Sequence, residues 1–384
     1  MKKSKLIILS FIIVVFPTVL SGCWDYKEID TLAIVAGIAI DRDISTNEYI
    51  VTTEIITTQA QGFTSNVNSE LFTSKGDTIF EAMRNMIQKT GLRLYWSGTK
   101  VVIISKTIAS QGIIPVIDWT SRDSDVRPDI WIMISKGDSA AEILKHKVKL
   151  NEVTSFHLDD TMMSGKILSG FKDSRLNSFL NEMTSEGNSC LLATVENQSS
   201  DDAIEPRLSG SAIFKSDKLV GYIDDTETLY MQMIKNKAHE GLIVLKNILG
   251  SSTNITLEIF ENRTKLTPKY NNGRVSMIID IYPVVAIDEV QGTKDFMKEE
   301  NLKMLQSEAE KEIEVRVQSL IDKLQKDYDS DVLGFDETFM REKPKASEDF
   351  KKSGEDIFQN MKTVVKVHMK IKGSGKTIKS IPTS

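Results

Sequence analysis

Apolar runs rich in β-branched residues dominate the first half of the chain. Residues 32–40 are almost continuously apolar, and residues 49–58 are dense in Val, Ile and Thr. Both patterns favour strands, and Asn47 supplies the turn of a hairpin between them. Further apolar runs predict three more strands at residues 100–105, 129–135 and 190–196.

Helical periodicity alternates with these strands. Residues 77–90 repeat apolar positions at helical spacing, with Asp77 placed to cap the helix and Gly91 to end it. Residues 108–119 predict another helix, broken or restarted at Pro115. We expect Asp138 or Ser139 to cap a short helix, and residues 150–190 to be helical in pieces. Strands alternating with helices predict a mixed α/β domain.

The second half begins with a new set of strands. Residues 210–215 and 219–223 predict a compact hairpin, followed by a helix at 226–235. Residues 255–261 and 274–287 predict two long strands, and Asn271-Asn272-Gly273 is a good signal for the turn between them. Residues 362–372 alternate as a closing strand.

One long amphipathic helix is the strongest periodic signal in the chain. Its apolar positions recur every three or four residues, which gives a helix of about 40 to 50 Å. We expect its wide apolar face to pack on a sheet of the same protein rather than on a coiled-coil partner. The positions are Leu302, Leu305, Ala309, Ile313, Val317, Leu320, Leu324 and Tyr328.

These elements predict an α+β (mixed α/β) fold of three small domains, built on mixed or antiparallel sheets with packed helices. At 384 residues the chain exceeds the size of a single core. Residues 197–206 are polar and acidic, which is typical of a linker. The predicted division is a leader at 1–22, an N-terminal mixed α/β domain at 23–196, the linker at 197–206, a middle α/β domain at 207–290 and a C-terminal helix-strand domain at 291–384.

The leader has the features of a lipoprotein signal peptide. Three lysines precede an apolar stretch at residues 6–16, which is too short to span a bilayer that needs about 20 apolar residues. Leu20-Ser21-Gly22-Cys23 follows, and a cysteine directly after Gly22 is where the lipoprotein pathway attaches a diacylglyceryl group. Cys23 then becomes the first mature residue and the site of lipid attachment.

The alternative is an uncleaved N-terminal anchor in which Cys23 is a bystander. Both interpretations place the rest of the chain outside the cytoplasm. The two acyl chains of a diacylglyceryl group hold a folded domain durably at a membrane, whereas one chain binds only marginally. We therefore expect a membrane protein that is lipid-anchored on the extracytoplasmic face.

Charge and cysteine content exclude some classes of partner and of reactive group. The formal charge is −6, and removal of residues 1–22, with three lysines and no acid, lowers it to −9. This argues against nucleic acid as the main partner. Once Cys23 is lipidated, Cys190 is the remaining thiol, and the apolar residues after it favour a buried, inert side chain over a reactive one.

Candidate catalytic and metal-binding groups are few. The chain has no Gly-rich phosphate loop, no Gly-x-Ser-x-Gly elbow and no Cys-x-x-Cys, and its four histidines are not at ligand spacing. His157 beside Asp159 and Asp160 is the nearest approach to an acid/base cluster, although a helix cap uses the same residues. Asp201-Asp202 and Asp224-Asp225 suit turns better than a calcium loop. We predict no catalytic, cofactor or metal site.

Two blocks of residues resemble the Ger(x)C family, the lipoprotein C subunits of bacterial spore germinant receptors. The first runs from Gly22-Cys23-Trp24-Asp25 through Glu28-Ile29-Asp30 to Gly37-Ile38-Ala39-Ile40-Asp41. The second begins at Leu208-Ser209-Gly210-Ser211-Ala212-Ile213-Phe214-Lys215 and recurs at Asp331-Val332-Leu333-Gly334-Phe335. The resemblance therefore spans nearly the whole chain.

The resemblance implies a non-enzymatic subunit of a nutrient germinant receptor, on the outer face of the inner membrane of the spore. It implies two membrane partners, a multi-pass A subunit and a transporter-like B subunit, and a role in assembly or signal relay. Cys23 is the one residue whose role carries over. The competing hypothesis is a membrane-anchored lipoprotein that itself binds a small solute.

Overall fold

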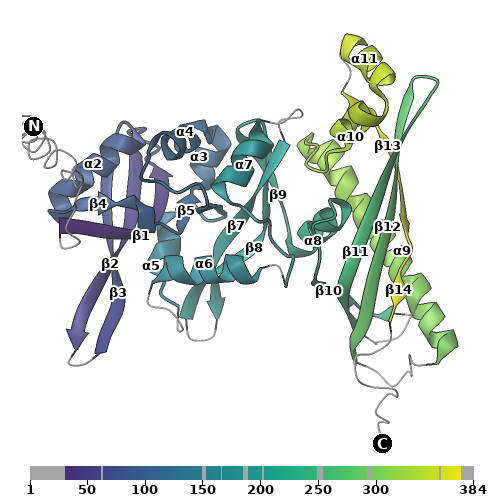
Figure 1. Ribbon diagram of the computed structural model, residues 1–384, viewed down its shortest axis with the longest axis horizontal. Coiled ribbons are helices and arrows are strands. Elements are labelled where there is room, and N and C mark those ends of the chain that lie inside the picture. The colour runs from purple at the N-terminus through teal and green to yellow at the C-terminus, as the bar shows by residue number, and fades with distance from the viewer. Residues whose placement is uncertain are drawn as a thin grey trace, which may run out of the picture.

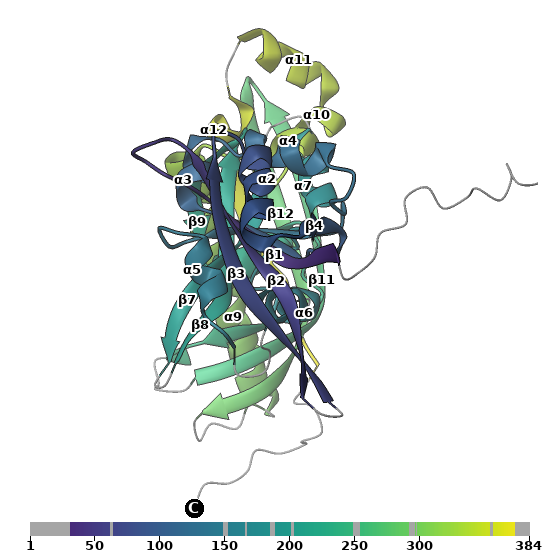
Figure 2. The same cartoon turned by 90° about the vertical axis from the view of Figure 1, so that its left-hand side faces the viewer.

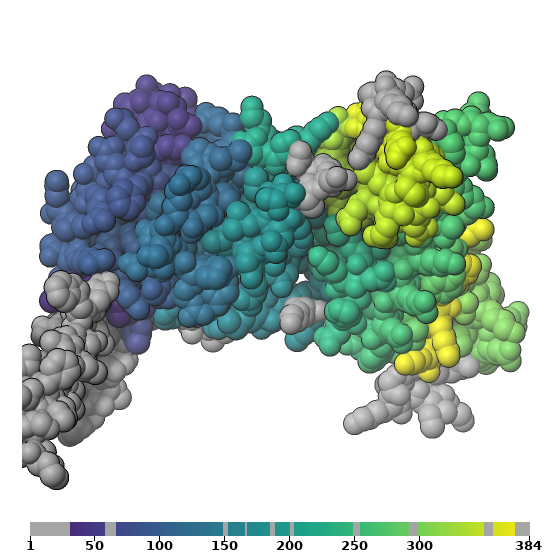
Figure 3. Space-filling view, turned by 45° about the horizontal axis from the view of Figure 1, so that its top comes forward, coloured from purple at the N-terminus to yellow at the C-terminus, as the bar shows by residue number. Residues whose placement is uncertain are grey.

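The computed structural model describes residues 31–61, 64–148, 153–165, 167–184, 189–200, 203–248, 254–291, 296, 298–353 and 356–372. Two lobes lie side by side along the longest axis of the molecule (Figure 1). The lobe coloured purple to teal holds the first sheet, and the lobe coloured green to yellow holds the second. Figure 3 shows a notch where the two lobes meet.

The first sheet is mixed. Its strand order is β3-β2-β1-β5-β6-β7-β8-β9, and β4 pairs with β1. Strands β1, β5, β6 and β7 pair in parallel, whereas β2-β3 and β8-β9 are antiparallel additions at the two ends. The strands are β1 (Leu32–Arg42), β2 (Tyr49–Gln61), β3 (Thr64–Gly76), β4 (Arg93–Tyr95), β5 (Val101–Ile104), β6 (Trp131–Ser135), β7 (Ser189–Ser200), β8 (Ala203–Lys215) and β9 (Lys218–Ile223).

Helices cover both faces of this sheet, which is why its central strands are continuously apolar. One face is covered by α2 (Ile79–Thr90), α3 (Lys106–Gln111), α4 (Ile114–Arg122) and α7 (Leu176–Met183), and the other by α5 (Ala141–Lys145) and α6 (Thr154–Ser164). Figure 2 shows α2 beside the β2-β3 hairpin. Pro115 lies in the first turn of α4, so the predicted break there is confirmed.

The second sheet has the order β10-β11-β12-β13, with β14 also paired to β12. Two 18-residue strands, β11 (Asn254–Asn271) and β12 (Arg274–Gln291), form its central hairpin. Asn272 and Gly273 have φ of 50° and 78°, as the tight turn predicted from Asn-Gly requires. The other strands are β10 (Gly241–Leu245), β13 (Lys362–Val367) and β14 (Lys370–Ile371).

The predicted long C-terminal helix is confirmed. α9 (Glu299–Lys323) continues into a π-helical turn, Leu324–Tyr328, and packs its apolar stripe on the second sheet. The remaining helices of this lobe are α8 (Asp225–Ile234), α10 (Phe335–Glu342), α11 (Pro344–Ser353) and α12 (Ile357–Asn360). Within the described ranges, no helix is both long and apolar enough to cross a membrane.

The linker prediction at residues 197–206 is wrong. Asn197 pairs with Pro206 and Ser199 with Ile204, because β7 and β8 form an antiparallel hairpin that runs through this segment. Its polar composition reflects the solvent-facing end of a hairpin. β8 and β9 thus belong to the first sheet, and β10 to β12 share the second sheet with β13; the division into three domains stays a prediction.

Two predicted helix caps are also wrong. The hydroxyl of Thr78, not Asp77, accepts the N–H of Glu81 at the start of α2. At α5, the carboxylate of Asp41 from the end of β1 accepts the N–H groups of Ala140 and Ala141, at 2.7 and 3.0 Å. A local pattern does not reveal a cap that is a hundred residues distant in sequence.

Candidate functional site: the joint between the lobes

The end of α9 is fixed against the last strand of the first sheet. The hydroxyl of Tyr328 donates to the carbonyl oxygen of Tyr222 at 2.9 Å. Its ring lies directly over Gly221, where a Cβ would come within 2.1 Å of the ring. The hydroxyl of Ser330 donates to the carbonyl oxygen of Phe214 at 3.1 Å, and Lys215 pairs with Asp329. The π-helical turn therefore connects the two lobes by side-chain and backbone contacts.

Helix α8 lies between the two sheets. Asp224 and Glu227 form a reciprocal capping box at its N-terminus, so Asp224 has the structural role expected of it. The side-chain amide of Gln232 donates to the carbonyl oxygens of Ser169 and Phe171, at 2.8 and 3.0 Å. Every residue from Thr228 to Ile234 is buried. The apolar core of the second lobe also includes Ile213 and Ile223 of the first sheet, so the core is continuous across the joint.

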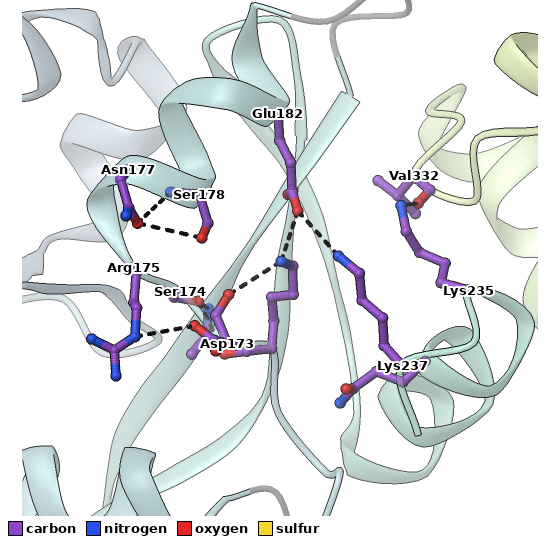
Figure 4. Close-up of polar contacts among 12 residues, drawn as sticks. Asp173, Ser174, Arg175, Asn177, Ser178, Glu182, Lys235, Lys237 and Val332 are labelled. Carbon is purple, nitrogen blue, oxygen red and sulfur yellow. Dashed lines mark hydrogen bonds and ion pairs between the residues drawn. The ribbon is translucent and has the colours of Figure 1, made fainter. Parts of the chain in front are cut away.

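A charged cluster lies beside α8 (Figure 4). Glu182 from α7 pairs with the buried Lys172 at 2.7 Å and lies 3.8 Å from Lys237. Lys235 at the end of α8 donates to the carbonyl oxygen of Val332 at 2.7 Å, and burial lowers its pKa. The cluster borders a cavity of about 580 Å³ that is also lined by Gln232. Glu182 is shared by Lys172 and Lys237, and Lys235 contacts a backbone carbonyl of the second lobe. The cluster therefore contributes polar contacts at the joint.

Two buried carboxyl groups, Asp331 and Asp336, lie in the second lobe near Lys235. Asp331 accepts the N–H groups of Gly334 and Asp336, at 2.9 and 2.7 Å, and burial raises its pKa. The Oδ1 atom of Asp336 is buried and has no hydrogen-bond partner among the described residues. Burial, together with the charges of Asp331 and Asp356, raises the pKa of Asp336 to about 8. Near neutral pH this carboxyl group is protonated.

We predict that Asp336→Asn stabilises the protein in a pH-dependent way. In the unfolded chain Asp336 loses its proton near about pH 4, whereas the folded protein keeps it up to about pH 8. The folded state is therefore favoured at low pH, and this contribution is lost as the pH rises through that window. The gain in melting temperature should be larger at about pH 8 than at about pH 5. Asp327→Asn, at an exposed carboxyl group, is the control; an equal gain at both pH values would contradict the assignment.

Two further hollows are present, one in the first lobe and one where the lobes meet. A groove of about 860 Å³ lies between α2, β4 and α4. The rings of Trp96 and Trp119 pack edge to face in its wall, with their centres 6.2 Å apart. A second hollow of about 510 Å³ lies between α6, β8 and α8, and His157 lines it. These concave, partly apolar sites are the places where a small solute would fit.

The acid/base cluster considered at residues 157–160 does not assemble. Asp159 is buried, accepts the indole N–H of Trp131 at 2.7 Å and pairs with Lys100 at 3.0 Å. His157 lies on α6 away from that pair and burial lowers its pKa. Asp201-Asp202 lies outside the described residues. In the described part of the chain, no group of three or more His, Cys, Asp or Glu is placed to hold a metal ion.

The structure describes one of the two cysteines. Cys23 lies outside the described residues, so its lipid attachment stays a prediction. Cys190 is buried on β7, and burial raises the pKa of its thiol to about 12. The predicted burial of Cys190 is confirmed, and a thiol whose pKa is raised is a poor nucleophile at neutral pH.

The joint itself was missed by sequence reasoning. Tyr328 stood out only as a position in the helical stripe, and Gly221 only as part of a strand. Tyr222 and Tyr328 are 106 residues apart, and no local pattern relates them. The available signal was the break of the apolar stripe at Asp329, which adopts a left-handed φ of 48°.

Comparisons with known proteins match both halves of the chain. Residues 25–196 match the family described as Spore germination protein N-terminal domain, and residues 209–375 the one described as Spore germination B3/ GerAC like, C-terminal. The chain is 25% identical to Spore germination protein KC of Bacillus subtilis (strain 168), over 87% of each protein. It is 26% identical to Spore germination protein B3 of the same organism, over 81% of this chain and 83% of the relative.

A solved structure has the same fold. The crystal structure of the GerBC protein superimposes with a TM-score of 0.59 at 20% identity, over 91% of this chain and 100% of that chain. The fold and the two matched ranges agree with the residue blocks that suggested the relationship. The chain belongs to the Ger(x)C family of spore germination proteins.

Proposed function

We propose that this protein is a lipid-anchored, non-enzymatic subunit of a nutrient germinant receptor, which acts in assembly or signal relay beside A and B membrane subunits. The observation that carries the proposal is the match of both halves of the chain to spore germination proteins, over most of their length. Leu20-Ser21-Gly22-Cys23 after a short apolar run supports the anchor.

The joint supports a relay role. α8 contacts both sheets, and α9 ends against β9, so the two lobes are connected through packed side chains rather than through a flexible linker. A force or a displacement applied to one lobe therefore has a physical route to the other. A subunit that served only to position its partners would not require this contact between its lobes.

Mass spectrometry of a tagged copy from dormant spores, purified in mild detergent, tests the proposal. We expect the N-terminal peptide to begin at a diacylated Cys23 and the A and B subunits to be recovered with it. An acylated protein that arrives without companions would reject the receptor assembly. Deletion of the gene with germination unchanged for every nutrient would reject the function.

We predict that Cys23→Ala abolishes membrane attachment through lipid. Without the thiol no diacylglyceryl group is added, so the mass of the protein should show no acyl chains. Most of the protein should leave the membrane fraction unless its leader stays uncleaved. Cys190→Ala is the matched control and should keep both the lipid mass and the membrane fraction. An unshifted mass between Cys23→Ala and the parent would contradict the processing site.

A small-solute lipoprotein is the second candidate function. The groove of about 860 Å³ with Trp96 and Trp119 in its wall favours it. A thermal-shift screen with amino acids, sugars and nucleosides tests it. A rise in melting temperature that Trp119→Ala removes would support a solute site, and no rise with any compound would count against it.

A further inference from the structure

Among the residues that the structure describes, no helix packs on the outer face of the second sheet. α8 and α9 pack on the inner face, through side chains such as Ile279 and Ile281. On the outer face, strand alternation and register bring side chains of neighbouring strands into rows that cross the sheet. Lys269, Ser276 and Lys362 form one row across β11, β12 and β13, and Lys265, Asp280 and Lys366 form another.

Most charges on this outer face are positive. We define the basic sheet face as the six exposed basic side chains that flank β12 on its two neighbours: Arg263, Lys265, Lys269, Lys362, Lys366 and Lys370. Two carboxylates, Glu261 and Asp280, lie among them. The face therefore carries a formal +4 on a chain whose net charge is −6. Further acids, Glu258 and Glu289, begin only toward β10, so the positive charge is local.

Apolar and aromatic side chains lie among the basic side chains of this sheet. Tyr282 is 41% exposed and stacks on His368, with ring centres 4.9 Å apart. Val364 is 46% exposed on β13, and Phe260, the extra residue of a bulge in β11, is 53% exposed. A monomer gains nothing from leaving these side chains in water. Aromatic rings flanked by lysines are typical of surfaces that meet lipid headgroups.

We propose that the basic sheet face binds an anionic lipid bilayer. Three of the six basic residues lie on β11 and three on β13 and β14, so the two sets are two strands, or about 10 Å, apart. None of them lines any of the three hollows described above. An array of exposed cations with interspersed aromatic rings is complementary in charge to a surface of anionic headgroups.

This inference rests on the proposed membrane anchor for its physiological setting. An acylated Cys23 would hold the protein at the bilayer, and seven residues separate it from Thr31, the first described residue. The tether raises the effective concentration of lipid around the sheet, so a weak electrostatic contact suffices to orient the molecule. The face would then set which sides of the joint remain available to membrane partners.

Vesicle sedimentation tests the proposal on the mature chain, residues 23–384, with Cys23→Ser to remove the lipid. The vesicles are phosphatidylcholine alone or an equal mixture with phosphatidylglycerol. We expect binding to the anionic vesicles only, and its loss as salt is raised. The combined change Lys269→Glu, Lys362→Glu and Lys370→Glu should lower vesicle affinity by about a hundredfold or more, since three basic contacts are lost.

The control reverses three exposed lysines away from this face: Lys303→Glu and Lys311→Glu on α9 and Lys145→Glu on α5, whose side chains are 74%, 66% and 53% exposed. Both triple variants have the same net charge, so only position differs. Equal loss in both, no loss in the sheet variant or no binding to anionic vesicles would overturn the proposal. If vesicles do not bind but the sheet variant loses companion proteins from spores, an acidic polypeptide is the occupant instead. These outcomes are independent of whether Cys23 is acylated.

Discussion

Gly221→Val is expected to destabilise the protein by about 3 kcal/mol and to loosen the two lobes from one another. A Cβ at this position would lie 2.1, 2.3 and 2.7 Å from three atoms of the Tyr328 ring. The ring cannot remain there, and its hydroxyl loses the carbonyl oxygen of Tyr222. Thermal unfolding and limited proteolysis should both detect the change, with a lower melting temperature and faster cleavage near residues 324–330.

Two variants show whether this clash is the cause. Gly137→Ala is the matched control, because a Cβ there has the hydroxyl of Ser135 as its nearest neighbour, at 3.6 Å. It should leave the melting temperature almost unchanged. Combining Gly221→Val with Tyr328→Ala removes the ring with which valine clashes. The double variant should therefore lose less stability than the two single variants together. Full additivity would mean that Gly221 acts through some other contact. A stable Gly221→Val protein that still recovers its receptor partners would show that the joint is not needed for assembly.

Short-range patterns predicted most elements of the fold. The hairpin around Asn272, the restart at Pro115 and the long helix each depend on residues within a few positions of one another. The hairpin through residues 197–206 was missed because both its strands are polar there. Polar side chains at a solvent-facing end of a hairpin look like a linker in composition, and only the pairing of Asn197 with Pro206 separates the two.

The candidate site was predictable only where its signal is local. Cys23 follows from four adjacent residues, whereas the joint brings together β9, α8 and the end of α9. The same limit applies to buried carboxylates. Glu54 lies in the middle of a strand that the sequence predicts, and nothing around it indicates that its charge is buried or what it binds.

Glu54→Ala is expected to cost about 3 to 4 kcal/mol of stability. The carboxylate is 1% exposed and accepts the N–H groups of Thr154 and Ser155, at 2.9 and 2.8 Å. These are the first residues of α6, and Val153 before them provides no side-chain cap. The N-terminal N–H groups of a helix have no partner within the helix, and the helix dipole favours a negative charge beside them. Alanine leaves both buried N–H groups without an acceptor from β2.

The measurement is urea unfolding of Glu54→Ala beside Glu70→Ala, which removes an exposed carboxylate from the neighbouring strand. Glu70→Ala should change the free energy of unfolding by less than about 0.5 kcal/mol. Hydrogen exchange should show that the backbone amides of α6 lose protection first, because Glu54 connects that helix to the first sheet. Since α6 also carries His157 into the hollow beside α8, a loosened α6 would alter the joint from the first lobe alone. If Glu54→Ala lost the proposed A and B partners at a temperature where the protein stays folded, α6 would take part in the proposed relay. An unchanged free energy of unfolding would show that the N-terminus of α6 is held by other groups.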